Sequence, residues 1–299
     1  MPKKAEIAIG GQALIEGVLM RSRNLAGMAV RLPDGKIKTK VEMLKKPSAF
    51  WRIPFFRGIY NLISMLVVGI RALNWSASQT AKEEEKPSDF ALYVTIIFAF
   101  ALGVGLFVLL PYVLTFLIGI SEDSSPVLFN FVDGLIKIAI LLAYVYGISL
   151  VGEVKRLYQY HGAEHKVVHC YEKNLPLTIN NAKKFPTLHP RCGTSFLFIV
   201  IIVGIIVFSF TPLMASLYPD INEIHWAARR AILFFMRILL LPVVAGLSYE
   251  FLKWSAKYSS HRVLGVLVMP GLLLQRITTK EPSKKQIEVA IAALRLVAK

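Results

Sequence analysis

Charged residues and cysteines are scarce in this chain of 299 residues. Only 18% of the side chains are charged, 55% are hydrophobic, and the mean hydropathy is +0.54. One soluble core of this length cannot hide so much apolar surface, so the composition excludes an ordinary soluble protein and predicts contact with lipid. The two cysteines, Cys170 and Cys192, exclude a disulfide framework.

Acidic residues are also few relative to basic ones. The chain carries 35 Lys and Arg against 19 Asp and Glu, a formal net charge of +16. This excess favours an anionic neighbour: a phospholipid bilayer with anionic headgroups, RNA or an acidic protein. No signal peptide is expected, because residues 1–35 mix charges and glycines with only short apolar runs.

Four stretches are apolar over the roughly 20 residues that a bilayer crossing needs. They cover residues 90–120, 131–151, 196–218 and 231–249. Pro111 is expected to kink the first, and Arg237 interrupts the fourth. Residues 55–73 contain two arginines and predict an interfacial or re-entrant helix that does not cross, as do residues 263–274. The sequence therefore predicts a mainly α polytopic membrane protein with four transmembrane helices.

Lys and Arg are missing from two of the connecting loops, which predicts the orientation. Residues 121–130 and 219–228 carry none, whereas segments 1–89, 152–195 and 253–299 carry 31 of the 35 basic residues. By the positive-inside rule, both termini are expected in the cytosol.

The chain divides at the spans into six parts. They are an N-terminal β unit, an interfacial or re-entrant helix with a linker, the first two spans, a His/Cys-rich loop, the last two spans and a basic tail, with bounds at 1–47, 48–89, 90–151, 152–195, 196–252 and 253–299.

Two of the cytosolic parts show clear secondary-structure signals. Residues 27–44 alternate in polarity around a Pro-Asp-Gly turn, which predicts a β-hairpin. Residues 5–20 are expected to add a strand in which Gly10 and Gly11 form a bulge or turn. The tail is expected to end in a helix from about residue 284, with Ser283 as its N-cap and Gln286 completing a capping box.

Four of the six histidines and both cysteines lie between residues 160 and 192. Residues 152–172 lack proline and predict a helix that continues from the second span. One stripe of this helix carries His161, Glu164, His165, Val168, His169 and Glu172. A second cluster, His189-Pro190-Arg191-Cys192, stands directly before the third span. Five of the six residues on the stripe are of types that can bind metal ions or transfer protons.

The spacing of the first two histidines points to a metal site. His161 and His165 are four residues apart, as when one helix face holds a transition metal with two imidazoles. The run also fits the H-x-x-E-H pattern, in which Glu164 acts as general base. His189 and Cys192 are the candidates for the third and fourth ligands, and this donor set suits zinc. The competing interpretation is a group of interfacial or core histidines.

Glu16 is a second candidate catalytic residue. It lies in an apolar, glycine-punctuated run, where a carboxylate is costly unless it is paired. It is a candidate ligand or general base, and equally a candidate partner for Arg21 or Arg23. Within the spans, Asp133 and Lys137 are expected to neutralise each other.

Three motifs resemble the YqhQ-like family of bacterial membrane proteins. They are GGQALIEGVLMR at 10–21, YHGAEHK at 160–166 and HPRCGTSF at 189–196, and the run QRITTKEP at 275–282 is also similar. The resemblance covers essentially the whole chain and implies a metal-dependent enzyme in the bacterial cytoplasmic membrane. The positions that match are Glu16, His161, Glu164, His165, His189 and Cys192.

Two functions follow from these features. The first is a metal-dependent hydrolase at the cytosolic face of the membrane that acts on a membrane-associated substrate. The second is a non-enzymatic scaffold or biogenesis factor whose basic cytosolic face docks RNA, a ribosome or a protein partner. A closed four-ligand site favours the scaffold, whereas an open metal position beside a carboxylate favours the enzyme.

Overall fold

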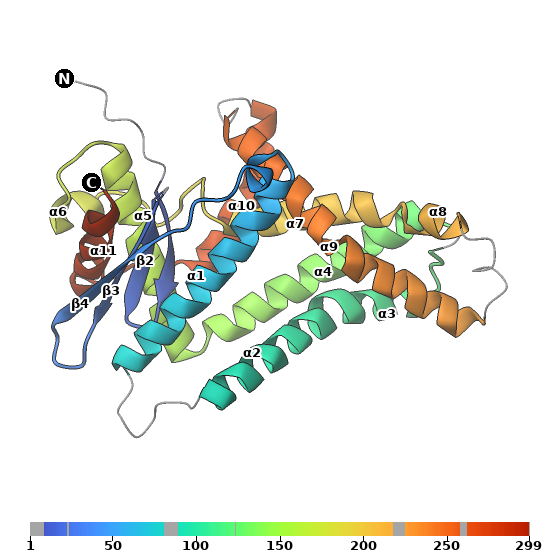
Figure 1. Cartoon of the computed structure of the whole chain (residues 1–299), viewed down its shortest axis with the longest axis horizontal. Coiled ribbons are helices and arrows are strands. Elements are labelled where there is room, and N and C mark those ends of the chain that lie inside the picture. The colour runs from blue at the N-terminus through green and yellow to red at the C-terminus, as the bar shows by residue number, and fades with distance from the viewer. Residues whose placement is uncertain are drawn as a thin grey trace.

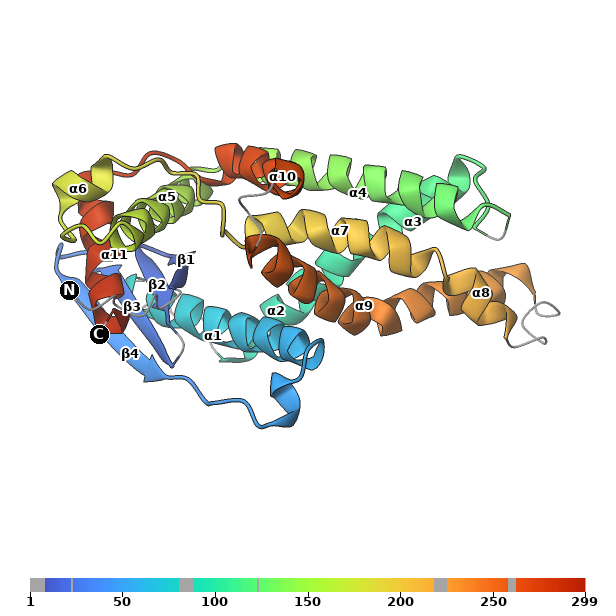
Figure 2. The same ribbon diagram turned by 90° about the horizontal axis from the view of Figure 1, so that it is seen from above.

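The structure is a computed structural model that describes residues 9–22, 24–80, 89–122, 124–217, 225–257 and 262–298. The linker expected at 82–86 and most of the expected loop at 219–228 lie outside these residues. A mixed α/β unit occupies one end of the molecule and a bundle of long helices the other (Figures 1 and 2). Within this arrangement, the N-terminal and C-terminal segments lie together in the α/β unit.

The N-terminal residues form a four-stranded antiparallel sheet in sequential order. Its strands are β1 (Gly10–Leu14), β2 (Gly17–Arg21), β3 (Leu25–Arg31) and β4 (Ile37–Met43). The predicted hairpin is confirmed as β3 and β4, and Gly35 in its turn has a φ of 86°. The first turn is not at Gly10 and Gly11, as expected, but at Ile15 and Glu16. Gly11 serves close packing instead, because a Cβ there would lie 2.7 Å from Glu164 Cγ.

Three helices cover the sheet: α1 (Phe56–Thr80), α5 (Gly152–Glu172) and α11 (Lys284–Val297). Strand side chains alternate between its faces. Val18 and Met20 pack in a core with α5 and α11, while Leu19 packs in a second core with Val68 and Ala72 of α1. The sheet is therefore enclosed on both faces by helices.

Two helix predictions are confirmed in this unit. The α11 N-terminus is held by the predicted capping box, in which Ser283 and Gln286 satisfy each other's backbone N–H groups. The bounds of α5 also agree with the prediction. However, α5 does not continue from the preceding span, since Leu150 and Val151 separate the two helices and Val151 is extended.

The bundle contains most of the remaining helices. They are α2 (Asp89–Val104), a π-helical segment (Gly105–Leu109), α3 (Leu110–Leu117), α4 (Pro126–Ser149), α7 (Thr194–Phe208), α8 (Thr211–Ser216) and α9 (Trp226–Lys257). Three pieces remain: a 3₁₀ turn (Phe50–Arg52), α6 (Ile179–Lys183), which packs in the α/β unit, and α10 (Arg262–Thr278), which packs on α4 and α7. Pro111 lies at the start of α3, directly after the π-helical segment, where an irregularity was expected.

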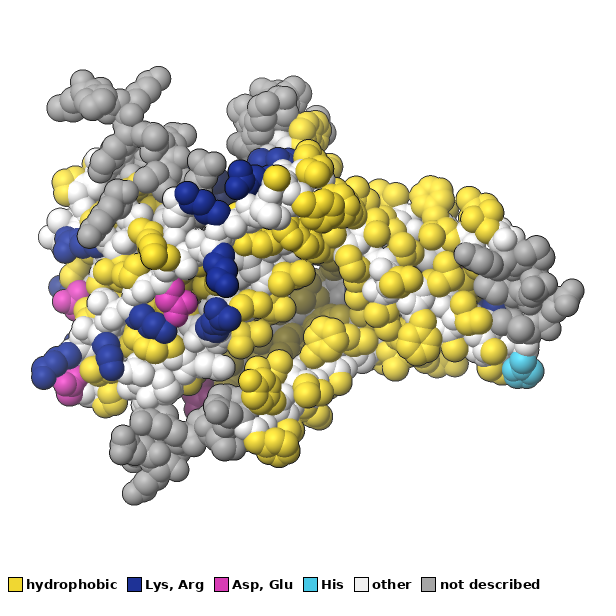
Figure 3. Space-filling model, in the orientation of Figure 1, with side chains coloured by type: hydrophobic (Ala, Val, Ile, Leu, Met, Phe, Trp, Pro, Cys, Tyr) yellow, Lys and Arg dark blue, Asp and Glu magenta, His cyan; other side chains and the backbone are white. Residues whose placement is uncertain are grey.

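Five helices among the described residues are long and apolar enough to cross a membrane. They are Phe56–Thr80, Tyr93–Leu117, Pro126–Ser149, Phe196–Ser216 and Trp226–Trp254. Apolar side chains cover the bundle, while charged side chains gather on the α/β unit (Figure 3). The chain is thus a mainly helical membrane protein with a small antiparallel sheet. The expected count of four spans is not decided by helix length and composition, because α1 also qualifies.

The bundle encloses a network of charged side chains. The Arg237 guanidinium donates to Glu122 at 2.9 Å and to Asn130 at 2.8 Å, and it lies 3.6 Å from Asp133. Asp133 also binds Lys137, as the sequence predicted. Arg237 is only 1% exposed and Glu122 is fully buried. Buried charges of opposite sign offset each other here, which permits them inside an apolar bundle.

Candidate metal centre

The centre is built on helix α5, which carries His161 and His165 one helical turn apart. The rings of His161 and His165 lie with their centroids 4.4 Å apart on the side of the helix that faces the rest of the α/β unit. His165 is buried, and His161 is partly buried. The i, i+4 spacing thus produces the expected pair of neighbouring imidazoles.

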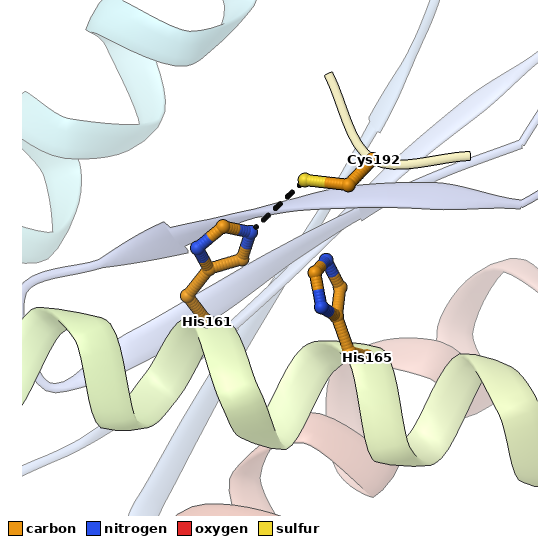
Figure 4. Close-up of side chains that lie close together, drawn as sticks. All are labelled: His161, His165 and Cys192. Atoms are coloured by element: carbon orange, nitrogen blue, oxygen red, sulfur yellow. Dashed lines mark hydrogen bonds between the residues drawn. The ribbon is translucent and has the colours of Figure 1, made fainter. Parts of the chain in front are cut away.

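Cys192 is brought to these histidines by the loop that follows α6. Its Sγ lies 3.3 Å from His161 Nε2 (Figure 4). Two contacts fix the path of the loop: Lys166 donates to the Phe185 carbonyl at 2.8 Å, and Gln275 exchanges two hydrogen bonds with the His189 backbone. The side chains of Lys166 and Gln275 are both buried, and their hydrogen bonds hold the loop in place beside α5.

Backbone carbonyls orient both imidazoles. His161 Nδ1 contacts the Thr278 carbonyl at 2.9 Å, and His165 Nδ1 contacts the Thr187 carbonyl. A carbonyl oxygen only accepts, so each Nδ1 carries the proton and each Nε2 keeps its lone pair. The Nε2 atoms lie on the Cys192 side of the rings, and a backbone carbonyl on the opposite ring nitrogen is typical of imidazoles that bind transition metals.

Glu164 lies beside the same three residues. Its Oε2 is 3.7 Å from His165 Nε2 and 4.0 Å from His161 Nε2, and its carboxylate accepts a hydrogen bond from the Gly11 backbone. Burial raises the pKa of Glu164, while the nearby histidines act in the opposite direction. Burial also lowers the pKa of His165, which favours the neutral imidazole that a metal ion needs.

The donor set fits a zinc ion. The ligand atoms of His161, His165 and Cys192 all lie within 4.8 Å of one another. Tetrahedral zinc with bonds of 2.0–2.1 Å to nitrogen and 2.3 Å to sulfur would separate two such ligands by about 3.5 Å. The observed 3.3 Å between His161 and Cys192 is close to that value. Two imidazoles and a thiolate are also the ligand types that select zinc over magnesium or calcium.

His189 belongs to a neighbouring group instead of this one. Its Nε2 lies 3.3 Å from Glu172 Oε1, and its ring centroid is 4.4 Å from that of His169. These three residues form a second set whose ligand atoms lie within 4.8 Å of one another. Arg191 already pairs with Glu172, so an ion pair neutralises this second set. Of the two sequence candidates for the third ligand, the structure therefore brings Cys192 to the histidine pair.

In the described part of the chain, Glu16 is not among the residues that converge with the histidine pair. It occupies the β1–β2 turn with a φ of 52°, and its carboxylate binds Arg156 and accepts from Tyr160 Oη at 3.1 Å. Burial raises the pKa of Tyr160, so this phenol stays a donor. The partner is thus Arg156 and not Arg21, while Arg23 lies outside the described residues, and Glu16 joins the sheet to α5.

The sequence alone did not identify the residues that support the centre. Thr278 and Gln275 belong to the tail motif at 275–282, which carried no assigned role, although Gln275 is fully buried. A Cβ on Gly162 would lie 2.2 Å from the Lys280 carbonyl, so this glycine lets the tail approach α5. The signal in the sequence was the QRITTKEP motif at 275–282. A buried amide such as that of Gln275 needs a hydrogen-bond partner, so the motif indicated a contact with another part of the chain.

Comparison with known proteins decides the family. Residues 53–299 match the family model described as "Protein of unknown function (DUF1385)". The chain belongs to this family. It is 35% identical over 308 residues to the "Uncharacterized protein YqhQ" of Bacillus subtilis (strain 168), covering 96% of this chain and 91% of that relative. The YqhQ-like resemblance is thereby confirmed. No solved structure matches the chain.

Proposed function

We propose that this DUF1385 protein is a zinc-dependent hydrolase of the bacterial cytoplasmic membrane, with a single metal held by His161, His165 and Cys192. One observation carries the proposal: two imidazoles and a thiol converge, while the carboxylate of Glu164 stands 3.7–4.0 Å from both imidazole nitrogens. Three protein ligands with a carboxylate beside them are typical of catalytic zinc, whose remaining position stays open.

Each residue then has a defined task. Zinc supplies Lewis acidity when it is bound. The Thr278 and Thr187 carbonyls keep the imidazoles in the ligating tautomer. Glu164, held by the Gly11 N–H, accepts and returns a proton at Oε2, the oxygen nearest the two histidines.

The position of the centre favours a membrane-associated substrate. Cys192 lies two residues before α7 begins, and Thr278 is the last residue of α10, whose Leu274 packs between α4 and α7. Cys192 and the carbonyl that orients His161 thus belong to segments that enter or leave the bundle. A substrate anchored in the bilayer would present its polar part at this level, whereas a soluble substrate gains nothing from that placement.

Four spans, with both termini in the cytosol, complete the proposal. Strands β2 and β3, α5 and α11 share one core, so they lie on the same side of the membrane. The number of crossings between the sheet and α5 must therefore be even, yet three helices connect them. Of these, α1 has the lowest mean hydropathy, 1.4, and its second half packs on the sheet. We assign α1 to the membrane surface and the crossings to α2–α3, α4, α7–α8 and α9.

Cysteine labelling tests this topology. We expect an impermeant maleimide to label Ser124→Cys in intact cells, but not Lys36→Cys or Lys284→Cys, because only residue 124 lies in an external loop under this proposal. All three side chains are exposed. The wild-type chain is the control, since Cys170 and Cys192 are both on the cytosolic side. Labelling of Lys36→Cys would place the sheet outside the cell and contradict the proposed topology.

The alternative function is the scaffold or biogenesis factor. Glu164 lies close enough to the two histidines to become a fourth ligand, which would close the site and leave a structural metal. The basic cytosolic face would then dock RNA, a ribosome or a protein. The two functions differ in one measurable property: whether an outside ligand can reach the metal.

Cobalt substitution separates the two. We expect the Co(II)-loaded protein to show thiolate-to-metal absorption that disappears in Cys192→Ser and persists in Glu164→Gln. Added azide should shift the visible Co(II) bands of the wild-type protein, because an open position admits an anion. A different result would support the scaffold: azide does not shift the Co(II) bands of the wild-type protein, and the Glu164→Gln substitution does change them. Glu164 would then be a metal ligand, and the scaffold would replace the hydrolase as the proposed function.

A further inference from the structure

A basic recess lies on the other side of the α/β unit from the metal centre, between the end of β2, the segment after β4 and the start of α1. Its volume is about 580 Å³, within the range of small-ligand sites. It is lined by Arg21, Asn24, Leu44, Lys45, Lys46, Pro47, Arg52, Tyr60 and Asn61. In Figure 3, basic side chains gather between the α/β unit and the apolar bundle.

The recess carries four cations, Arg21, Lys45, Lys46 and Arg52, and within the described part of the chain none of them forms an ion pair. Among the residues that the structure describes, no Asp or Glu lines it. The nearby Glu250 is already bound to Arg57 and to the Phe55 N–H, so it does not neutralise the recess. A concave surface with charge of one sign concentrates ions of the opposite sign.

Arg21 shows the clearest need for an anion. One of its amino groups donates to Ser64 Oγ at 3.1 Å, but the other, Nη1, is buried and has no hydrogen-bond partner in the described part of the chain. Burial lowers the pKa of Arg21, so the charge is poorly solvated. A buried guanidinium donor without an acceptor is costly, and an oxyanion would satisfy it.

Aromatic side chains place the recess at the membrane surface. The rings of Phe50 and Trp51 lie 5.3 Å apart, and Trp51 lies 6.0 Å from Tyr60, which itself lines the recess. Phe50 and Ile53 are each about half exposed, at 51% and 49%. Exposed aromatic groups of this kind sit at the level of lipid headgroups. The recess therefore opens where phosphates of a bilayer are found.

We propose that this recess binds the phosphate group of an anionic phospholipid. The ligand would accept hydrogen bonds from Arg21, Lys45, Lys46 and Arg52, while its acyl chains lie against the exposed apolar side chains of α1, such as Ile63 and Leu66. Because Arg21 ends β2 and Tyr60 belongs to α1, the bound lipid would tie the sheet to the surface helix. The metal centre takes no part in this site.

Lipid binding by the full chain in detergent tests the proposal. Native mass spectrometry would follow a titration with short-chain phosphatidylglycerol, and separately with phosphatidylcholine and inorganic phosphate. We expect phosphatidylglycerol to bind more tightly than phosphatidylcholine. In Lys45→Gln/Lys46→Gln, we expect its Kd to rise about tenfold or more, since charge-assisted contacts are lost. Both lysines are exposed, so the variant should fold normally.

A matched control removes the same charge elsewhere. Lys183 and Lys184 are also adjacent and exposed, and their double Gln variant should bind phosphatidylglycerol like the wild type. Arg21→Gln should weaken binding as the first variant does. Equal losses in the two double variants would reduce the effect to general surface charge and overturn the proposal. So would equal binding of both lipids, or binding of inorganic phosphate without any of phosphatidylglycerol.

Discussion

Replacing His161 or His165 with alanine is expected to release the metal and to destabilise the α/β unit. In the proposed centre each residue supplies one of three ligand atoms, so the loss of affinity should exceed the roughly 10–100-fold that follows removal of a supporting partner. Metal binding in such sites is coupled to folding, so the melting temperature should fall as well. Metal analysis and thermal unfolding of the purified variants check both effects.

The control for this prediction lies on the same helix. His169 continues the stripe, but its ligand atoms belong to the second set, with Glu172 and His189. His169→Ala and His189→Ala should therefore keep stoichiometric metal. If His189→Ala loses the metal as completely as His161→Ala, a ligand set without His189 is wrong.

Arg237→Met is expected to cost about 3–5 kcal/mol of stability, because it strands charged groups inside the bundle. Glu122 would lose the guanidinium that binds it at 2.9 Å, and Asp133 would retain only Lys137. The Glu122 carboxylate would keep its hydrogen bonds from the hydroxyls of Tyr112 and Thr211. Denaturant unfolding in detergent measures the loss.

The matched variant removes both charges of the pair. In Arg237→Met/Glu122→Gln no unpaired carboxylate remains at this position, so the double variant should be more stable than Arg237→Met alone. Such recovery is specific to the charge pair, because loss of the aromatic contacts of Arg237 is common to both variants. A double variant that is less stable than the single one would show that the ion pair contributes little.

Local sequence patterns predicted several helices and strands of the α/β unit well. The bounds of α5, the capping box of α11 and the β3–β4 hairpin depend on residues within a few positions of one another, and all three are confirmed. The extent of α1 was not predictable in this way. It runs past residue 73 to Thr80, because its second half is stabilised by the sheet, a contact between distant parts of the chain.

The candidate centre shows the same division. The pairing of His161 with His165 follows from helical spacing, and Glu164 follows with them. The choice of Cys192 over His189 depends on how Gln275 and Lys166 hold the loop, which no local spacing encodes. The pairing of Glu16 with Arg156 was likewise not predictable from local spacing, because the two residues are 140 positions apart in the sequence.

X-ray absorption at the zinc edge tests the central claim most directly. For protein purified without chelator, we predict about one zinc per chain, with one sulfur neighbour at about 2.3 Å and imidazole nitrogens at about 2.0–2.1 Å. The sulfur signal should vanish in Cys192→Ser and persist in His189→Ala. Protein without stoichiometric metal, or zinc without a sulfur neighbour, would contradict a centre made by His161, His165 and Cys192.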